Sequence, residues 1–216
     1  MNMRNLELRR EIMMQADLEG RGIRDPNVLA AMREVPREEF VAPDFKDQAY
    51  EDYPLPIEEG QTISQPYIVA FMAEALELSP GDRVLEIGSG SGYSAAVLSR
   101  IADRIITVER FSALAERAGE RLRRLGYDNI VIFAGDGTLG WPEEAPYDAI
   151  VVTAAAPRLP EPLLKQLAIG GRLVVPVGPD LLGQTLVRVR RIKENEYREE
   201  RLLAVQFVPL IGAAGW

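Results

Sequence analysis

The sequence of 216 residues predicts an α/β domain built on a mostly parallel, seven-stranded sheet with helices on both faces. Three observations predict this class. Short apolar segments alternate with helical patterns between residues 66 and 177, which is typical of parallel strands joined by helices. A glycine-rich stretch follows the first apolar segment, as in nucleotide-binding α/β folds. Two further strand-like segments flank a polar turn at Glu194-Asn195-Glu196, which predicts a C-terminal antiparallel hairpin.

The N-terminal third is expected to form a cap on the main fold. Residues 6–19 and 26–33 have helical patterns, and Asp25 followed by Pro26 is a typical start for the second helix. Residues 35–57 carry four prolines among aromatic residues, which predicts an ordered but irregular wrap. We expect a single domain, with the cap at 1–60, the core at 61–180 and a hairpin with a substrate-covering tail at 181–216.

The core elements follow from the period of the apolar residues. Helices are expected over residues 66–78, 93–101, 112–125 and 161–167. Strands are expected over residues 83–87, 104–108, 130–133, 149–152, 172–177, 185–192 and 198–208. Short apolar strands that alternate with helices indicate a parallel sheet that is covered on both faces.

The composition excludes several kinds of chemistry. The chain has no cysteine and no histidine, so disulfides, thiolate or imidazole metal sites and histidine-assisted nucleophiles are impossible, and we expect no metal. The formal net charge of −8 disfavours a nucleic-acid partner. No apolar run approaches the ~18 residues of a membrane span, and the N-terminus lacks an apolar secretory core. We therefore predict a cytoplasmic protein without a membrane partner.

The glycine-rich stretch joins the first core strand to the next helix and is expected to bind a ligand. It has the pattern G-x-G-x-G, in which Gly88, Gly90 and Gly92 allow a sharp turn and close backbone approach. Dinucleotide enzymes instead favour G-x-G-x-x-G. Glu86 lies two residues before the first glycine, where it disfavours a pyrophosphate and favours a cationic ammonium group. A glycine-rich turn without a ligand is the alternative, and an alternating strand–helix chain makes it the weaker one.

Acidic residues also end the next two strands. Glu109 ends the second strand, where a carboxylate can accept both ribose hydroxyls. Asp136, between Gly135 and Gly137, follows the third strand and can accept the amino group of an adenine, although this turn alone could be a plain strand end. Together with Glu86 and the glycine loop, these residues describe a ligand with an amino-acid end, a ribose and an adenine. S-adenosylmethionine fits that description, so we predict a Rossmann-like class I methyltransferase.

The sequence resembles the protein-L-isoaspartate O-methyltransferases over nearly its whole length. The most specific segment is Gly60-Gln61-Thr62-Ile63-Ser64-Gln65-Pro66-Tyr67, which is similar to the bacterial branch of that family. Residues 35–37 with 40–41, 148–157, 170–178 and 207–210 resemble further family segments. The resemblance implies transfer of the methyl group of S-adenosylmethionine to the free α-carboxylate of L-isoaspartyl residues in damaged proteins. It also implies that the last two strands are exchanged relative to most class I methyltransferases.

The resemblance assigns site residues along the chain. Ser64 is expected beside the acceptor carboxylate, which needs no general base because it is already ionised at neutral pH; a plain helix N-cap is the alternative role of Ser64. The expected cofactor residues are Thr62, Glu86, Gly88, Ser89, Gly90, Gly92, Glu109, Arg110, Gly135, Asp136, Gly137 and Thr153. The expected substrate residues are Ile63, Ser64, Gln65, Pro66, Ala154, Ala155, Val208 and Leu210.

Other functions stay open on the sequence alone. A class I methyltransferase for another small-molecule or protein carboxylate is the nearest alternative. A nicotinamide oxidoreductase and a binding module without activity are more distant ones. We expect a monomer, and residues 212–216 match no pattern of the family. The Asp136-Gly137 pair is also a candidate for isoaspartate formation within the proposed cofactor site.

Overall fold

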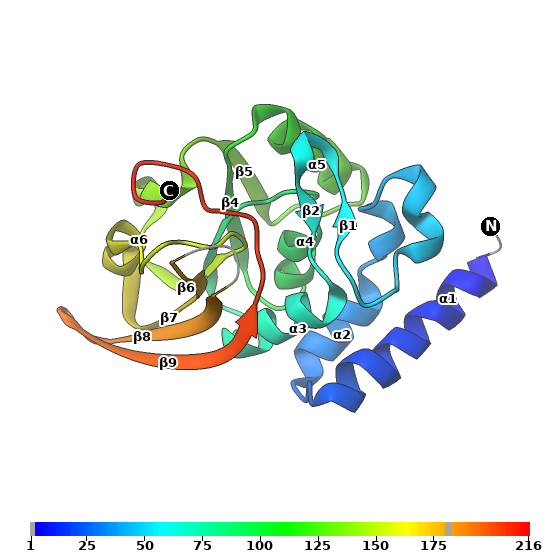
Figure 1. Cartoon of the computed structure of the whole chain (residues 1–216), viewed down its shortest axis with the longest axis horizontal. Coiled ribbons are helices and arrows are strands. Elements are labelled where there is room, and N and C mark those ends of the chain that lie inside the picture. The colour runs from blue at the N-terminus through cyan, green and yellow to red at the C-terminus, as the bar shows by residue number, and fades with distance from the viewer. Residues whose placement is uncertain (1–2, 180–182) are drawn as a thin grey trace.

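The computed structural model describes residues 3–179 and 183–216, and a seven-stranded sheet forms its centre (Figure 1). The strand order is β5-β4-β3-β6-β7-β8-β9. The bounds are β3 (Arg83–Ile87), β4 (Arg104–Glu109), β5 (Ile130–Ala134), β6 (Tyr147–Val152), β7 (Leu167–Val177), β8 (Gln184–Lys193) and β9 (Glu196–Val205). Strands β3 to β7 pair in parallel, and β8 and β9 add an antiparallel hairpin. This order confirms the predicted fold class. The last two strands, β8 and β9, lie in the sheet in the same order as in the chain.

The helices lie where their patterns predict. They are α1 (Met3–Ile12), α2 (Pro26–Glu34), α3 (Pro66–Ala75), α4 (Tyr93–Ser99), α5 (Ser112–Arg124) and α6 (Glu161–Gln166). Asp25 caps α2, because its carboxylate accepts hydrogen bonds from the backbone N–H groups of Asn27 and Val28. The first predicted helix differs in one respect. It continues beyond α1 as a π-helical segment (Met13–Leu18), whose wider turn accompanies the burial of Met13, Met14 and Leu18.

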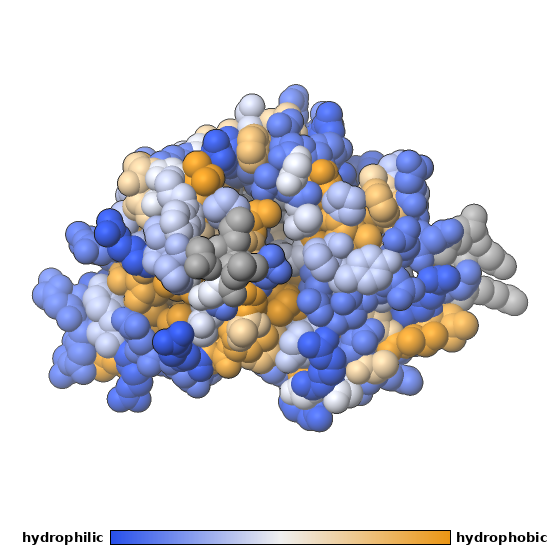
Figure 2. Space-filling model, in the orientation of Figure 1, coloured by the Kyte–Doolittle hydropathy of each residue, from blue (hydrophilic) through white to orange (hydrophobic). Residues whose placement is uncertain are grey.

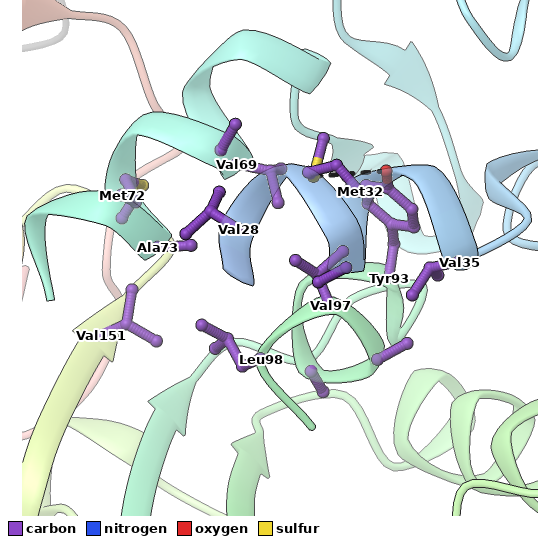
Figure 3. Close-up of a cluster of buried hydrophobic side chains, with 14 of the residues drawn as sticks. Val28, Met32, Val35, Val69, Met72, Ala73, Tyr93, Val97, Leu98 and Val151 are labelled. Carbon is purple, nitrogen blue, oxygen red and sulfur yellow. Dashed lines mark hydrogen bonds between the residues drawn. The ribbon is translucent and has the colours of Figure 1, made fainter. Parts of the chain in front are cut away.

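The two faces of the sheet bury separate apolar clusters. One cluster joins α2, α3 and α4 to the sheet, and Figure 3 shows Val28, Met72, Val97 and Val151 converging there from four elements. The other lies on the opposite face and includes Ile106, Ile150 and Leu163 of α6. Alternation along the strands explains the division, because successive side chains point to opposite faces.

The described part of the N-terminal cap, residues 3–60, contributes to both the core and the surface. The irregular wrap contains a short strand, β1 (Leu55–Pro56), which pairs antiparallel with β2 (Thr62–Ile63). Phe40 and Tyr50 of the wrap are buried, as their aromatic character predicts. Helix α1, at one end of the molecule, exposes Leu8 and Ile12 by 60% and 55%, and Figure 2 shows hydrophobic surface along that helix. None of the helices in the described ranges is long and apolar enough to cross a membrane.

Strand boundaries near the chain end differ from the prediction. Strand β7 begins at Leu167, earlier than expected, with an irregularity opposite residues 147–149 that Gly170 accommodates at a φ of 85°. Strand β9 ends at Val205 because the side chain of Gln184 replaces a strand partner, hydrogen bonding both the N–H and the carbonyl of Phe207. Residues 207–211 are thereby directed away from the hairpin (Figure 1). The predicted boundary at residues 180 and 181 lies outside the described residues.

Candidate active site

A cavity of about 340 Å³ opens at the carboxyl ends of the parallel strands. That volume and position are typical of small-molecule sites in α/β folds. Four segments supply most of its wall, namely residues 60–64, 87–91, 108–111 and 208–211. Gly137, Thr153 and Ala154 contribute from the ends of β5 and β6, and Val69, Tyr93 and Ser94 contribute from α3 and α4. The tertiary fold therefore brings the glycine loop, the residue 60–64 segment and the C-terminal region to one place.

The glycine loop is held in a tight conformation at the cavity. Gly88 has a φ of 95°, and a Cβ atom there would lie 2.4 Å from the hydroxyl oxygen of Thr153. That hydroxyl lies 2.7 Å from the carbonyl oxygen of Gly88, to which it donates. Ser89 lies in the wall, and its buried hydroxyl has no protein partner. Gly92 does not line the cavity but begins α4 at a φ of 88°, close to Leu122.

Glu109 is a buried carboxylate at the tip of β4. Its side chain is in the cavity wall, and the residue is 5% exposed. One oxygen accepts a hydrogen bond from the N–H of Gly90 at 2.9 Å, and the other accepts one from the N–H of Phe111 at 3.0 Å. The two bonds link the acid to the glycine loop and fix its orientation. Arg110 also lines the cavity.

Glu86 lies behind the cavity and does not form part of its wall. It is fully buried, and one of its oxygens accepts a hydrogen bond from the hydroxyl of Thr107 at 2.7 Å while the other has no partner. Burial raises its pKa to about 7, against the lowering influence of the nearby Ser94 and Thr107 hydroxyls. The structure places Glu86 behind the wall, and its expected interaction with an ammonium group stays a prediction. On the sheet, Glu86 of β3 lies opposite Thr107 of β4. Ser94, which is close to Glu86, does line the cavity.

The turn after β5 contacts both the cavity and the C-terminal end of the chain. Gly137 lines the cavity, and a Cβ atom there would lie 2.6 Å from Ile87. Gly135 and Asp136 are outside the wall. The Asp136 carboxylate accepts hydrogen bonds from the N–H and hydroxyl of Thr138 and from the N–H of Ala213 at 2.8 Å. Burial opposes the change, but these hydrogen bonds lower the pKa of Asp136. The expected adenine acceptor thus also anchors the C-terminal tail (residues 212–216).

The residue 60–64 segment enters the cavity from the cap side. Thr62, Ile63 and Ser64 all line the cavity. Ser64 is not the N-cap of α3, because that position belongs to Gln65, so the alternative role as a cap is wrong. The carbonyl of Ser64 accepts a hydrogen bond of 2.8 Å from Nη2 of the buried Arg37.

Two residues of the same motif do not lie in the cavity wall. The side-chain amide of Gln65 donates to Asp52 at 2.6 Å, and Pro66 is buried at the first turn of α3. Their expected contact with substrate therefore stays a prediction. After Ser64 the chain turns into α3, and Gln65 contacts Asp52 of the cap there.

The C-terminal segment closes the other side of the cavity. Ala155 donates to the carbonyl of Val208 at 2.8 Å and accepts from the N–H of Leu210 at 2.7 Å, which forms a parallel bridge at Pro209. Val208, Leu210 and Ala154 are in the wall. Ala155 is 1% exposed and does not line the cavity, so it supports the wall from behind.

Sequence reasoning missed part of the wall. The missed residues are Gly60, Gln61, Val69, Ile87, Ser91, Tyr93, Ser94, Val108, Phe111, Pro209 and Ile211. Most are chain neighbours of predicted residues, and adjacency could have found them. Val69 lies on α3 and carries no local signal, because only the packing of α3 brings it to the cavity.

The wall is suited to a nucleoside cofactor that carries an amino acid. Gly88 and Gly137 let the backbone of the wall pack closely on Thr153 and Ile87, where any side chain would collide, and the Ser89 hydroxyl is an unsatisfied buried group in the same loop. Glu109 is an acceptor held in place by two backbone N–H groups, and its carboxylate oxygens have further capacity to accept hydroxyl groups. These features, on this sheet, define a class I S-adenosylmethionine-dependent methyltransferase. Among the described residues no group of acidic, histidine or cysteine side chains could hold a metal ion.

Comparison with known proteins identifies the family. Residues 8–215 match the Protein-L-isoaspartate(D-aspartate) O-methyltransferase family, and the chain belongs to it. It is 65% identical over 215 residues to Protein-L-isoaspartate O-methyltransferase 2 of Pelobacter propionicus, covering 100% of this chain and 96% of that protein. It is 68% identical over 213 residues to Protein-L-isoaspartate O-methyltransferase 1 of Geotalea uraniireducens, covering 99% and 97%.

Solved structures of similar proteins agree with this family. A protein-L-isoaspartate O-methyltransferase aligns with a TM-score of 0.85 at 35% identity, over 95% of this chain and 67% of its own. A Plasmodium falciparum protein of that name, in complex with S-adenosyl-L-homocysteine, aligns with a TM-score of 0.78 at 30% identity. That alignment covers 92% of this chain and 96% of the other.

Proposed function

We propose that this chain repairs damaged proteins by methylating the free α-carboxylate of L-isoaspartyl residues, and that Ser64 holds the carboxylate. The observation that carries the proposal is the meeting of Ser64 with the glycine loop and the 208–211 segment around one cavity. The methyl ester starts the conversion of the residue back to an aspartyl residue. Membership of the protein-L-isoaspartate(D-aspartate) O-methyltransferase family supports the same reaction.

The cofactor side of the cavity uses backbone and acid groups. Gly88, Gly90 and Ser89 contact the cofactor through the glycine loop, and Glu109 accepts hydrogen bonds from its ribose hydroxyls. Gly137 and Asp136 lie beside its adenine, and Arg110 and Thr153 border the same side. Glu86 acts from behind the wall, where it accepts a hydrogen bond from the Thr107 hydroxyl and lies close to Ser94. S-adenosylmethionine, when bound, supplies a methyl group on a cationic sulfur, which a carboxylate can accept without a base.

The acceptor side positions an anion. A free carboxyl group has a pKa near ~3.9, so it is ionised at neutral pH, and the absence of histidine from the chain is no obstacle. The Ser64 hydroxyl donates a hydrogen bond that orients the nucleophilic oxygen. Ile63, Val208 and Leu210 exclude water around it, and Ala154 leaves room for the peptide backbone. Orientation of this kind can contribute up to roughly 7–11 kcal/mol to a reaction barrier.

A paired-peptide assay tests the proposal. The chain is incubated with labelled S-adenosylmethionine and either an isoaspartyl peptide or its normal aspartyl twin. Label transferred to the isoaspartyl peptide alone supports the proposal. Transfer to both peptides, or to small carboxylic acids and neither peptide, would contradict it in favour of another carboxylate acceptor. A chain that binds cofactor but never transfers label would instead be a binding module.

Partners and location follow as further parts of the proposal. The substrates are damaged proteins and peptides, and the enzyme acts as a monomer in the cytoplasm without a nucleic-acid or membrane partner. The net charge of −8 supports the exclusion of nucleic acid. Sedimentation of the purified chain at several concentrations checks the oligomeric state.

A further inference from the structure

We infer that Arg37, a buried arginine behind the cavity, supplies the positive charge that makes the acceptor subsite selective for an anion, and also positions Ser64. This inference rests on the proposed role of Ser64. Arg37 belongs to the short helix η3 (Arg37–Glu39) in the cap, is 0% exposed and does not line the cavity. Any effect of Arg37 on the substrate must therefore be transmitted by the residues that it contacts.

Arg37 contacts two residues of the cavity wall. Its Nη2 atom donates to the carbonyl of Ser64 at 2.8 Å. Its guanidinium carbon lies 4.7 Å from the ring centroid of Tyr93, a cation–π distance. Figure 3 shows Tyr93 in the buried cluster with its hydroxyl directed to Met32. The guanidinium is thus only one residue behind the surface that the substrate meets.

Among the described residues no acidic side chain pairs directly with Arg37, although Asp52 lies near enough to attract its charge. Within residues 3–179 and 183–216, none of the ion pairs includes Arg37. Its Nε donates to the carbonyl of Ala49 at 2.7 Å, while Nη1 has no hydrogen-bond partner. Burial lowers its pKa, yet an arginine keeps its proton in proteins. A buried, unpaired cation is costly, so its presence calls for an anion that binds nearby.

The other buried charges around the cavity are acidic. Glu109 lines the cavity, and Glu86 lies behind the glycine loop. Both are suited to the cationic cofactor, but the Glu109 carboxylate, and Glu86 in its ionised form, repel an acceptor carboxylate. Arg37 beside Ser64 offsets that repulsion. The result is a division of charge, with acids at the strand tips for the cofactor and a cation behind the 60–64 segment for the substrate.

The test measures charge discrimination in binding. Two peptides are compared, the isoaspartyl peptide and the same peptide with a carboxamide in place of its free α-carboxylate. Binding is measured by calorimetry to the full chain saturated with S-adenosyl-L-homocysteine, so that no turnover occurs. A unit charge within several ångströms of an anion, at an effective dielectric constant of ~20, favours the anion by about 10- to 50-fold. We expect this ratio in the wild-type chain.

The variants separate charge from structure. Arg37→Met should reduce the ratio to about threefold or less by weakening the carboxylate peptide alone. Arg172→Met is the matched control, because Arg172 is also largely buried and donates to the carbonyl of Leu76, but it is paired with Asp82 at 2.7 Å. The control should keep the wild-type ratio. An unchanged ratio in Arg37→Met, or equal weakening of both peptides, would overturn the inference.

Two measurements keep the inference testable if Arg37→Met does not fold. Arg37→Lys keeps the charge and should retain most of the ratio while lowering kcat, because lysine cannot donate to Ala49 and Ser64 in the same geometry. The wild-type ratio should also persist in about 0.5 M salt, since buried charges are poorly screened. Loss of the ratio in Arg37→Lys or in salt would assign it to other groups, such as the exposed Arg110. Methyl transfer by the wild-type chain tests the proposed function separately.

Discussion

The indole nitrogen of Trp216 donates a hydrogen bond of 3.0 Å to the carbonyl oxygen of Ala155. The same carbonyl accepts the N–H of Leu210, which lies in the cavity wall. Two further hydrogen bonds from the tail, by the N–H groups of Ala213 and Ala214, reach Asp136 and Thr138. The tail therefore connects the end of β6 to the turn after β5 and supports the 208–211 segment from behind.

Replacing Trp216 by phenylalanine should loosen the substrate side of the cavity. The variant loses one hydrogen bond worth about 1 kcal/mol, so the KM for an isoaspartyl peptide should rise about threefold to fivefold. The affinity for S-adenosyl-L-homocysteine should stay within about twofold. Trp141→Phe is the control, because Trp141 stacks on Phe133 with ring centroids 3.9 Å apart and lies outside the cavity wall. Equal effects of the two variants on KM would argue against a role for the tail.

Ser64→Ala should lower kcat while cofactor binding is kept. Removal of a single hydrogen-bond donor at a reacting centre costs on the order of 10- to 100-fold in rate. Methyl transfer is measured with labelled cofactor, and affinity for S-adenosyl-L-homocysteine is measured by calorimetry. Ser99→Ala is a suitable control, since the Ser99 hydroxyl donates to the carbonyl of Ala96 within α4. Normal turnover by Ser64→Ala would remove this hydroxyl from the mechanism.

Glu109→Gln should weaken the cofactor more than the peptide substrate. The glutamine oxygen can replace one acceptor, but its amide nitrogen cannot accept from Gly90 or Phe111 as the carboxylate does. Hydrogen bonds to charged groups contribute about 1.5–3 kcal/mol, so the dissociation constant of S-adenosyl-L-homocysteine should rise about 10- to 100-fold. Calorimetry provides the measurement. An unchanged constant would show that Glu109 only shapes the loop.

The Glu86→Gln substitution should raise the unfolding free energy, relative to the wild-type chain, by more at high pH than at low pH. Burial raises the pKa of Glu86 from 4.5 to about 7, so the folded chain binds a proton more tightly than the unfolded chain. The resulting stability is fully present below pH 4.5 and is lost as the pH rises to about 7. The unfolding free energy of Glu86→Gln minus that of the wild type should therefore grow by up to about 3 kcal/mol between pH 5 and 8. Urea unfolding without cofactor measures it, and a constant difference would contradict the raised pKa.

Ageing should damage the Asp136-Gly137 pair and reduce activity. Glycine leaves the succinimide route unhindered, but hydrogen bonds from Thr138 and Ala213 restrain the Asp136 carboxylate. We expect bound cofactor to slow isoaspartate formation at Asp136 by making the turn more rigid. Peptide mapping after incubation with and without S-adenosyl-L-homocysteine measures the damage. Equal isoaspartate in the two samples would exclude protection.

Local patterns predicted most of the architecture. Apolar period and cap residues located the helices and the strands of the sheet, since burial of an apolar face largely decides both. Boundaries were less accurate where a distant side chain intervenes. Strand β9 ends early because Gln184, from β8, takes over the hydrogen bonds of Phe207. The pattern of residues 198–208 alone contains no sign of that contact.

In the candidate site, too, local patterns identified some residues, while contacts between distant residues decided the position of others. Ser64, Glu109 and the glycines could be identified because each lies in a segment with a distinctive local pattern. Glu86 was identified by the same logic, but strand pleating and the packing of Ser94 and Thr107 place it behind the wall. Gln65 has a partner, Asp52, thirteen residues earlier in the chain, and that contact turns its side chain from the cavity.

The sequence by itself determined the fold class, the nucleotide-binding loop, the family and the absence of histidine or thiol chemistry, because these depend on residue types and local periodicity. Only the tertiary structure decided which residues share the cavity, how the tail reaches Asp136 and Ala155, and that Arg37 lies beneath Ser64. The physical reason is that these contacts join residues far apart in the chain. Their geometry arises from the packing of the cap and the C-terminal segment on the sheet.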